Sequence, residues 1–464
     1  MEKFDAIIVG AGSAGLGCLG MAQKRGWKAV IIDKDEKNIG GDCLNYGCVP
    51  SKAMIHIAKQ FQGAKKAQSF GLNVTGKADM KSILNYIHKT QATIRAHESA
   101  DYLRSQNVDL RIGEAQFTGS HTIKVGDQEI YGEKIFICTG SHPRVIPFEG
   151  LDQVDFLTNE NIFYNLTELP ERFLVIGGGP IGCEMAQCMA RFGSEVTIIN
   201  RGDRILGNER PEISEILQDR LSEEGITIHC KWSLKSFSSA HAAVIENRDS
   251  GKTMEIPFDR VLLAIGRGLN HSSMNVAAAG IEETDRGRLV IDDYLRTTAS
   301  HIYAVGDAAG MYQFSHGAEK HVNLLKHNFD HFFDRKHKVH DLSWVTFTDP
   351  EIATFGYSES YLQDQGINYW RQDQDFGHDD RGITSDYAYG RMSLYTTRGK
   401  DKRKRKILGG TIIAPYAGEI MQELHLAITT DLCLGDFLDK VYAYPTASRI
   451  NQQTIMGIVN YEGE

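Results

Sequence analysis

The sequence predicts an α/β fold in which two glycine-rich β-α-β units precede a C-terminal region of α+β type. Three observations lead to this fold class. An apolar, β-branched run is followed by the pattern G-x-G-x-x-G once at Gly10 and again at Gly177. Each pattern leads into a stretch of helical composition and then a second apolar run, which is the order of a β-α-β unit. After about Leu342, strand-like runs alternate with one late helix near residues 418–429, and no further phosphate motif occurs.

The first β-α-β unit opens the chain. Residues 4–9 form the first predicted strand, residues 16–25 the helix, and residues 29–32 a second strand that ends in Asp33. An acidic residue at the end of this strand is the one that such units use to bind a ribose. Strand, turn, helix and acid in this order predict a dinucleotide site.

The glycines of this first turn have separate physical roles. Gly10 permits the tight turn, Gly12 lets the backbone approach a pyrophosphate, and Gly15 lets the helix pack closely on the strand. The N-terminus of the helix then offers free N–H groups and the positive end of its dipole to the phosphate.

The second unit repeats this order. Residues 172–176 form a strand, residues 177–182 the glycine turn, residues 183–191 a helix and residues 196–199 the next strand. A chain with two dinucleotide sites most simply passes a hydride between two bound cofactors.

The second unit lacks the acid that closes the first. Asn200 stands at that position, Arg201 follows, and Arg204 is close by. An acid would repel a 2′-phosphate whereas arginine attracts one. The sequence therefore favours NADPH over NADH and leaves both open.

Two of the eight cysteines, Cys43 and Cys48, lie close together just after the first unit. Turn residues separate them, and such a pair beside a dinucleotide motif indicates a redox-active disulfide, not a structural one. If a helix runs on from Pro50, Lys52 lies one turn beyond Cys48, where its ammonium could stabilise a thiolate. A zinc site is disfavoured because no second pair with ligand spacing follows. An inert reduced pair is the remaining alternative.

Residues 40–52 read G-G-x-C-x-N-x-G-C-x-P-S-K, and with the first glycine turn they resemble the pyridine nucleotide–disulfide oxidoreductases. This family of class I flavoproteins includes dihydrolipoamide dehydrogenase, glutathione reductase and mercuric reductase. The resemblance covers essentially the whole chain. Its further motifs are Thr139-Gly140, Ala264-Ile265-Gly266-Arg267, Gly306-Asp307 and Thr348-Asp349-Pro350-Glu351.

The resemblance implies two Rossmann-type domains, which bind FAD and NAD(P), and a C-terminal α+β dimerisation domain. Residues 298–307 have strand composition and lie past the second glycine turn, so the first domain is expected to resume there. The expected boundaries are 1–150 and 272–342 for the FAD-binding domain, 151–271 for the NAD(P)-binding domain and 343–464 for the dimerisation domain.

The resemblance also implies roles for the redox residues. Cys48 would be the flavin-facing sulfur that forms a charge-transfer thiolate, and Cys43 the interchange sulfur that meets the substrate. Lys52 would lie near the flavin, paired with Glu184. Electrons would run from NAD(P)H through FAD and the Cys43–Cys48 disulfide to a small-molecule acceptor, in a homodimer that serves cell redox homeostasis.

Cofactor contacts are carried over residue by residue, with Asp33 meeting the adenosine ribose of FAD and Asp307 its ribityl chain. The residues expected to bind FAD are Gly10, Gly12, Ser13, Ala14, Gly15, Asp33, Lys34, Gly41, Asp42, Cys43, Lys52, Ala115, Thr139, Gly140, Gly306, Asp307 and Ser315. Those expected to bind NADP or NAD are Gly177, Gly179, Pro180, Ile181, Gly182, Asn200, Arg201 and Gly266. No resident metal is expected.

The chain departs from the family at the residues that handle a substrate thiol. Thiol-handling members carry His-Pro-Thr followed three residues later by Glu, whereas this chain has Tyr444 and Arg449 at those two positions. Tyrosine titrates near 10 and does not replace imidazole as a base at neutral pH. Tyr444 is kept as a candidate catalytic residue by position, with His425 and His316 as alternative bases.

Mercuric reductase resembles this chain in carrying tyrosine there, because a soft metal ion needs thiolates and not a base. That group ends in a vicinal cysteine pair, which the tail from Gly457 to Glu464 lacks. The acceptor therefore stays open between a small disulfide and a metal ion, quinone or oxygen. A flavoprotein kept for binding a partner is a third hypothesis.

Composition limits the remaining partners. Lys+Arg 51 against Asp+Glu 60 gives a formal net charge of −9, which is unsuited to broad binding of nucleic acid. Glycines break the apolar run near the start, and no other window approaches a membrane span, so we expect no membrane segment and a cytoplasmic protein. The basic run 398–406 predicts a solvated hairpin tip, with an acidic partner as the alternative.

Overall fold

The computed structural model describes residues 1–338 and 342–461, and the chain divides into two compact units. One unit holds residues 1–57, 76–170 and 260–337, and the other holds residues 58–75, 171–259 and those from 338 onward. Residues 339–341, which belong to the predicted FAD-binding domain, lie outside the described residues. The domain boundaries at 150, 271 and 342 stay a prediction.

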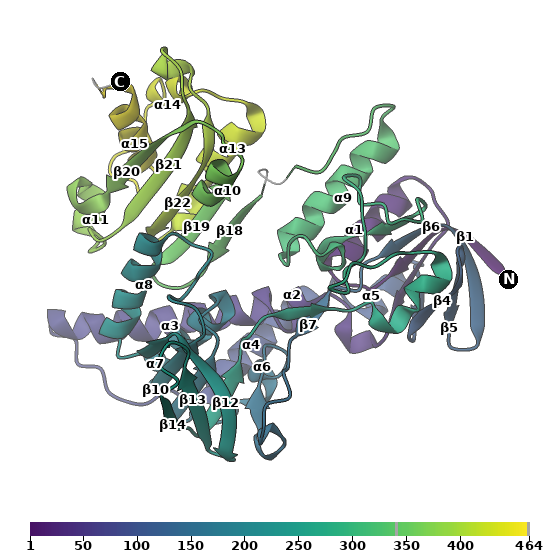
Figure 1. Ribbon diagram of the computed structural model, residues 1–464, viewed down its shortest axis with the longest axis horizontal. Helices are drawn as coiled ribbons and strands as arrows, with labels where there is room; N and C mark the ends of the chain where they lie inside the picture. Colours follow the sequence, from purple (N-terminus) through teal and green to yellow (C-terminus); the bar gives the residue numbers. More distant parts are fainter. Residues whose placement is uncertain (339–341, 462–464) are drawn as a thin grey trace. The chain divides into compact units, whose positions relative to one another are not determined.

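β1 (Glu2–Val9) lies in the middle of the main sheet of the first unit (Figure 1). It pairs in parallel with β2 (Ala29–Asp33) and with β6 (Gln128–Ile137). β17 (Ile302–Ala304) pairs in parallel with β6, so the chain returns to this sheet after the second glycine turn, as the sequence predicts. The other strands of this unit are β3 (Asp109–Ile112), β4 (Ala115–Gly119), β5 (Thr122–Val125), β7 (Ser141–Pro143), β8 (Phe156–Leu157), β15 (Arg260–Leu263) and β16 (Arg267–Leu269).

Two long helices, α1 (Ser13–Lys24) and α9 (Ser315–Asp330), pack side by side against this sheet (Figure 1). A Cβ on Gly17 would lie 2.9 Å from Cγ2 of Val322, so a glycine on α1 lets α9 approach closely. Both helices contribute buried residues to one hydrophobic core with strand residues of the sheet. The other helices that begin in this unit are α2 (Gly41–Asn45), α3 (Cys48–Ala67), α4 (Met80–Arg95), α5 (Ala100–Ser105) and α6 (Ile162–Asn165).

The second unit contains the second glycine turn. β9 (Arg172–Ile176), β10 (Glu195–Asn200) and β11 (Thr227–Cys230) pair in parallel, and α7 (Pro180–Phe192) follows the turn. α8 (Pro211–Glu223) comes between β10 and β11. An antiparallel sheet then forms from β12 (Trp232–Ser239), β13 (Ala242–Asn247) and β14 (Thr253–Pro257).

The C-terminal part of the second unit is an antiparallel sheet with helices around it, which confirms the predicted α+β type. Its strands, in spatial order, are β18 (Ser343–Thr346), β19 (Glu351–Gly356), β22 (Ile407–Ala414), β21 (Arg391–Thr397) and β20 (Tyr369–Asp375). Its helices are α10 (Glu359–Asp364), α11 (Asp380–Thr384), α12 (Ala417–Ile420), α13 (Gln422–Thr430), α14 (Leu434–Leu438) and α15 (Arg449–Val459). The α/β fold class is thereby confirmed. None of the helices described in residues 1–338 and 342–461 has the length and apolarity to cross a bilayer.

Arg191 on α7 forms a buried ion pair in the second unit. Its side chain is 3% exposed, and its guanidinium meets Glu224 at 2.6 and 2.8 Å and Asp349 at 2.8 Å. Glu224 follows α8 and Asp349 precedes β19, so one guanidinium joins the region of the second glycine turn to the C-terminal sheet within this unit. Removing one partner of a buried pair leaves the other charge uncompensated, which costs far more than the pair contributes.

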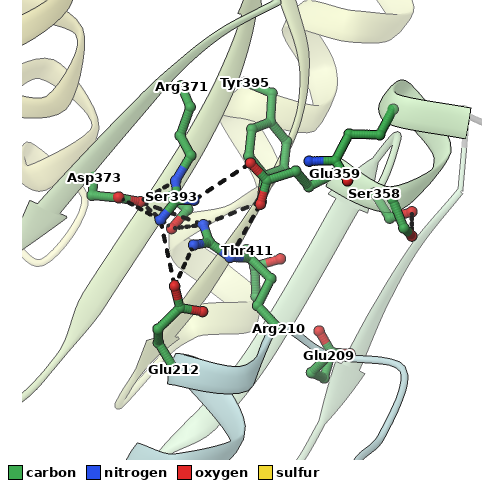
Figure 2. A network of polar contacts seen from close by, with 12 residues as sticks. Glu209, Arg210, Glu212, Ser358, Glu359, Arg371, Asp373, Ser393, Tyr395 and Thr411 are labelled. Carbon is green, nitrogen blue, oxygen red and sulfur yellow. Dashed lines mark hydrogen bonds and ion pairs between the residues drawn. The ribbon is translucent and has the colours of Figure 1, made fainter. Parts of the chain in front are cut away.

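A second polar network lies where α8 meets the same sheet (Figure 2). Arg210 donates to Oγ of Ser393 at 2.8 Å and to Oε1 of Glu212 at 2.8 Å. Asp373 accepts from Ser393 and pairs with Arg371 at 2.6 Å. Each charge has at least one opposite partner, and of these charged side chains Arg210 is the most covered.

We expect Arg191→Met to lower the free energy of unfolding by about 3–5 kcal/mol, since Glu224 and Asp349 would lose their shared cation. Urea denaturation followed by circular dichroism measures this. The matched control is Arg403→Ala, because Arg403 pairs with Asp439 on the surface at 2.7 Å and should contribute less than about 1 kcal/mol. Equal losses in the two variants would contradict the buried role of Arg191.

Candidate active site

The first glycine turn has the geometry that a pyrophosphate site needs. Gly10 has φ +104°, and a Cβ on Gly15 would lie 1.8 Å from the carbonyl oxygen of Gly10. A Cβ on Gly41 would lie 2.6 Å from Cα of Gly12, so the two backbones touch beside the start of α1. Only glycine fits these three positions, and the free N–H groups of α1 lie open next to them.

Asp33 ends β2 and holds this turn. Its Oδ2 accepts from the backbone N–H of Ala11 at 2.7 Å, and its Oδ1 accepts from the N–H of Asp35 at 3.3 Å. Burial raises the pKa of Asp33, and these backbone hydrogen bonds oppose that rise. Asp33 thus fixes the glycine turn in addition to its predicted contact with a ribose.

A chain of polar side chains connects Asp42 with Asp307. Asp307 accepts from the hydroxyl of Ser141, whose Oγ accepts from Nε of Arg267 at 2.8 Å. Nη2 of Arg267 lies 3.1 Å from Oδ1 of Asp42, which also accepts from Asn159 at 3.0 Å. The predicted site residues Asp42 and Asp307 are therefore held by one arginine.

The sequence prediction did not include Arg267, Ser141 or Asn159. Arg267 belongs to the quoted motif that ends in Gly266-Arg267, so that motif was the available signal. Burial raises the pKa of Asp307, and the nearby guanidinium of Arg267 opposes the rise. A half-buried acceptor close to the glycine turn suits a hydroxyl-rich chain such as that of a flavin cofactor.

The two cysteines lie on successive helices. Cys43 is on α2 and is half-buried, whereas Cys48 is the first residue of α3 and is exposed. Both are free thiols in this structure. Sγ of Cys48 lies 3.4 Å from Oγ of Ser315, the first residue of α9. The structure thus brings together three residues that the sequence placed at the site.

The surroundings of Cys48 favour its thiolate. Hydrogen bonds from Cys43 and Ser315 and the positive charge of Lys52 lower the pKa of Cys48 to about 6, against the effect of burial. The hydrogen bond to Cys48 and burial raise the pKa of Cys43 above its usual range. A helix N-terminus stabilises a thiolate as well. In the reduced pair, Cys48 therefore carries the negative charge and Cys43 keeps the proton.

Lys52 lies one helical turn past Cys48 on α3, as the sequence predicted from a helix running on from Pro50. Glu184 belongs to the second unit, where it is buried on α7 and its Oε1 accepts from the N–H of Phe347 at 2.9 Å. The predicted pairing of Lys52 with Glu184 joins the two units and stays a prediction.

The second glycine turn matches the first in its backbone. Gly177 has φ +119°, and a Cβ on Gly182 would lie 2.0 Å from the carbonyl oxygen of Gly177. Pro180 begins α7, where its missing N–H costs nothing. The same cradle therefore forms at both predicted dinucleotide sites.

Tyr444 lies in the C-terminal part of the second unit, whereas Cys43 and Cys48 belong to the first unit. Its side chain is exposed, its hydroxyl donates to Oδ2 of Asp380 at 2.7 Å, and the guanidinium of Arg449 lies 5.0 Å from its ring centroid. The Asp380 carboxylate raises the pKa of Tyr444. The shift favours the protonated phenol.

The remaining predicted residues lie at element ends. In the first unit, Ser13 and Ala14 begin α1, Lys34 follows β2, Ala115 opens β4, and Thr139 and Gly140 follow β6. Gly266 precedes β16, and Gly306 precedes Asp307. In the second unit, Gly179 and Ile181 flank Pro180, Asn200 ends β10, and Arg201 follows it. Of the alternative bases, His316 follows Ser315 on α9 and His425 lies on α13. Within residues 1–338 and 342–461, no group of three or more His, Cys, Asp or Glu side chains could hold a metal ion.

Two models of one protein family match this chain. Residues 4–322 match the pyridine nucleotide-disulphide oxidoreductase family, and residues 342–454 match the dimerisation domain of the same family. The chain belongs to this family of enzymes, whose members use FAD and NAD(P)H. The glycine cradles and the half-buried acceptor Asp307 fit these cofactors.

Individual relatives have different activities. The chain is 30% identical to a mercuric reductase of Bacillus cereus over 445 residues, which cover 96% of this chain and 69% of that protein. It is 30% identical to a dihydrolipoyl dehydrogenase of Chlamydia pneumoniae over 456 residues, or 97% and 95% of the two chains. Among solved structures, the copper(II) complex of the HOCl-induced flavoprotein disulfide reductase RclA from Escherichia coli has a TM-score of 0.83 at 25% identity, covering 98% and 99%.

We expect the thiolate signal of the reduced, FAD-loaded enzyme to fall as the pH drops through about 6, because Cys48 then gains a proton. Ser315→Ala should raise this midpoint by about one pH unit, since the thiolate loses a hydrogen bond. The long-wavelength absorbance band, titrated under anaerobic conditions, measures the midpoint.

Ser315→Thr keeps the hydroxyl and is the control for this titration. A midpoint that Ser315→Ala leaves in place would show that Ser315 does not stabilise the thiolate.

Proposed function

We propose that this enzyme carries electrons from NAD(P)H, by way of FAD, to the Cys43–Cys48 pair and on to a small acceptor. The arrangement around Cys48 carries the proposal, since one sulfur lies at a helix N-terminus within reach of Cys43, Ser315 and Lys52. Bound FAD would accept the hydride from NAD(P)H and pass its two electrons to the disulfide.

Each residue of the pair has its own part in the cycle. When the disulfide is reduced, Cys48 holds the negative charge and Cys43 holds the proton. Two electrons then pass from the pair to the acceptor, the Cys43 thiol releases its proton to solvent, and the S–S bond forms again. The family's dimerisation domain supports a homodimer, in which Tyr444 of one chain would lie near the cysteines of the other.

A thiophilic metal ion is the acceptor class that the geometry supports best. The Tyr444 hydroxyl already donates to Asp380, and Arg449 replaces the acid that would orient a histidine base. Capture of a soft ion requires thiolates and no acid–base residue, because the Cys43 proton is lost to solvent as the metal ion binds. The mercuric reductase relative and the copper complex of the similar structure support this class.

A small disulfide is the second candidate acceptor. The dihydrolipoyl dehydrogenase relative, which the match covers almost completely, favours it. Disulfide turnover requires protons to be placed on the leaving thiols, and general acid–base help contributes about 10²–10⁴-fold. No acid–base histidine stands at position 444, so we expect this turnover to be slow.

The double variant Cys43→Ala/Cys48→Ala is expected to lose at least about 100-fold of the NADPH oxidation driven by mercuric or cupric ions, because both thiolate ligands are removed. Anaerobic assays of NADPH oxidation with each metal chloride measure this loss. Cys433→Ala, a half-buried thiol of the C-terminal region, is the matched control. Undiminished metal turnover in the double variant would mean that electrons bypass the cysteine pair.

Tyr444→His separates the two acceptor classes. It should raise turnover of lipoamide by about tenfold or more, since imidazole titrates near neutral pH, and should leave metal turnover within about twofold. Tyr444→Phe is the control that removes only the hydroxyl. Fast lipoamide turnover by the unmodified enzyme would contradict the metal proposal and favour the disulfide one.

A further inference from the structure

The loop after β10 lies against the turn that joins β13 to β14, although the two are far apart in sequence. The N–H of Lys231 donates to the carbonyl of Gly202 at 2.9 Å, and the N–H of Arg248 donates to the carbonyl of Lys231 at 2.8 Å. Nη1 of Arg248 donates to the carbonyl oxygen of Arg201 at 3.2 Å. The Arg248 guanidinium is thereby held against the backbone of Arg201.

Both of these guanidinium groups keep donors for a ligand. Arg201 is exposed, and its guanidinium has no hydrogen-bond or ion-pair partner among residues 1–338 and 342–461. Arg248 is exposed as well, and its bond to Arg201 uses one of five donors. Lys231, in contrast, pairs with Asp249 at 2.8 Å and lies 4.0 Å from Asp203.

Arg204 is turned away from this position. Its Nη2 donates to the carbonyls of Gly207 and Glu209, each at 3.1 Å, so the guanidinium stabilises its own loop. The sequence favoured Arg204 as the second phosphate ligand only because it is near Arg201 along the chain. Arg248 instead lies next to Arg201, where a second phosphate ligand would be needed.

Asn200 removes the charge that would exclude a phosphate here. It ends β10, and its Nδ2 donates to the carbonyls of Gly202 and Arg204 at 3.1 and 2.8 Å. A Cβ on Gly178 would lie 2.9 Å from Cγ of Asn200, so this side chain packs on the glycine turn itself. In β-α-β units the residue at this strand end meets the adenosine ribose and selects for or against a 2′-phosphate.

We propose that Arg201 and Arg248 together bind the 2′-phosphate of NADPH, and that Arg248 is a specificity-determining residue supplied by the β13–β14 hairpin. The proposal rests on the proposed function, in which the second glycine turn binds NAD(P)H. Planar guanidinium groups bind phosphate oxygens through paired hydrogen bonds. The local charges are three cations, Arg201, Arg248 and Lys231, against two carboxylates, Asp203 and Asp249, which leaves a positive balance for a dianion.

The test compares two nucleotide fragments that differ only in the 2′-phosphate. Adenosine 2′,5′-bisphosphate and 5′-AMP are titrated by calorimetry into the oxidised, FAD-loaded enzyme, without turnover. The unmodified enzyme should bind the bisphosphate at least about tenfold more tightly, and Arg248→Ala should remove about tenfold of that preference. Arg248→Lys should keep only part of the preference for the bisphosphate, because lysine keeps the positive charge and loses the paired hydrogen bonds of the planar guanidinium group.

Lys252→Ala is the matched control, since Lys252 is an exposed cation on the same hairpin turn. An unchanged FAD spectrum in each variant shows that the fold is kept. Equal binding of the two fragments by the unmodified enzyme, or a preference that survives Arg248→Ala, would overturn this inference alone. Failure of both fragments to bind would instead overturn the proposed function.

Discussion

The convergence of two helix N-termini on the sulfur of Cys48 is the constraint on which the chemistry depends. Cys48 begins α3 and Ser315 begins α9, and their Sγ and Oγ atoms lie 3.4 Å apart. Each helix presents the positive end of its dipole there, so both favour an anion at one point. The thiolate is therefore stabilised by the backbone as well as by the side chains of Cys43 and Lys52.

The packing of the first unit explains how this placement arises. Glycine on α1 lets α9 approach, and α9 carries Ser315 to the start of α3. Arg267 links Asp42, next to Cys43, with Ser141 and through it Asp307. The cysteine helix and the turn beside the flavin cradle are thus held by the same few contacts.

Two residues of the C-terminal region depart from the pattern expected of family members that handle a substrate thiol. A tyrosine whose proton is held by Asp380 replaces an imidazole, and a guanidinium replaces a carboxylate. Under the proposed function, both changes would remove proton transfer to the acceptor and leave the cysteine pair intact. A soft metal ion that binds thiolates directly fits this combination, because its capture needs the negative charge of the thiolates and no base.

The sequence by itself determined the features that depend on local backbone geometry. The glycine turns, the acid that ends β2, and the position of Lys52 one turn past Cys48 all follow from short segments, so their spacing predicted them. Tertiary structure decided which distant side chains complete each site. Three contacts depend on how separate strands and helices pack, and no spacing along the chain encodes them. They join Ser315 to Cys48, Arg267 to Asp42 and Ser141, and Arg248 to Arg201.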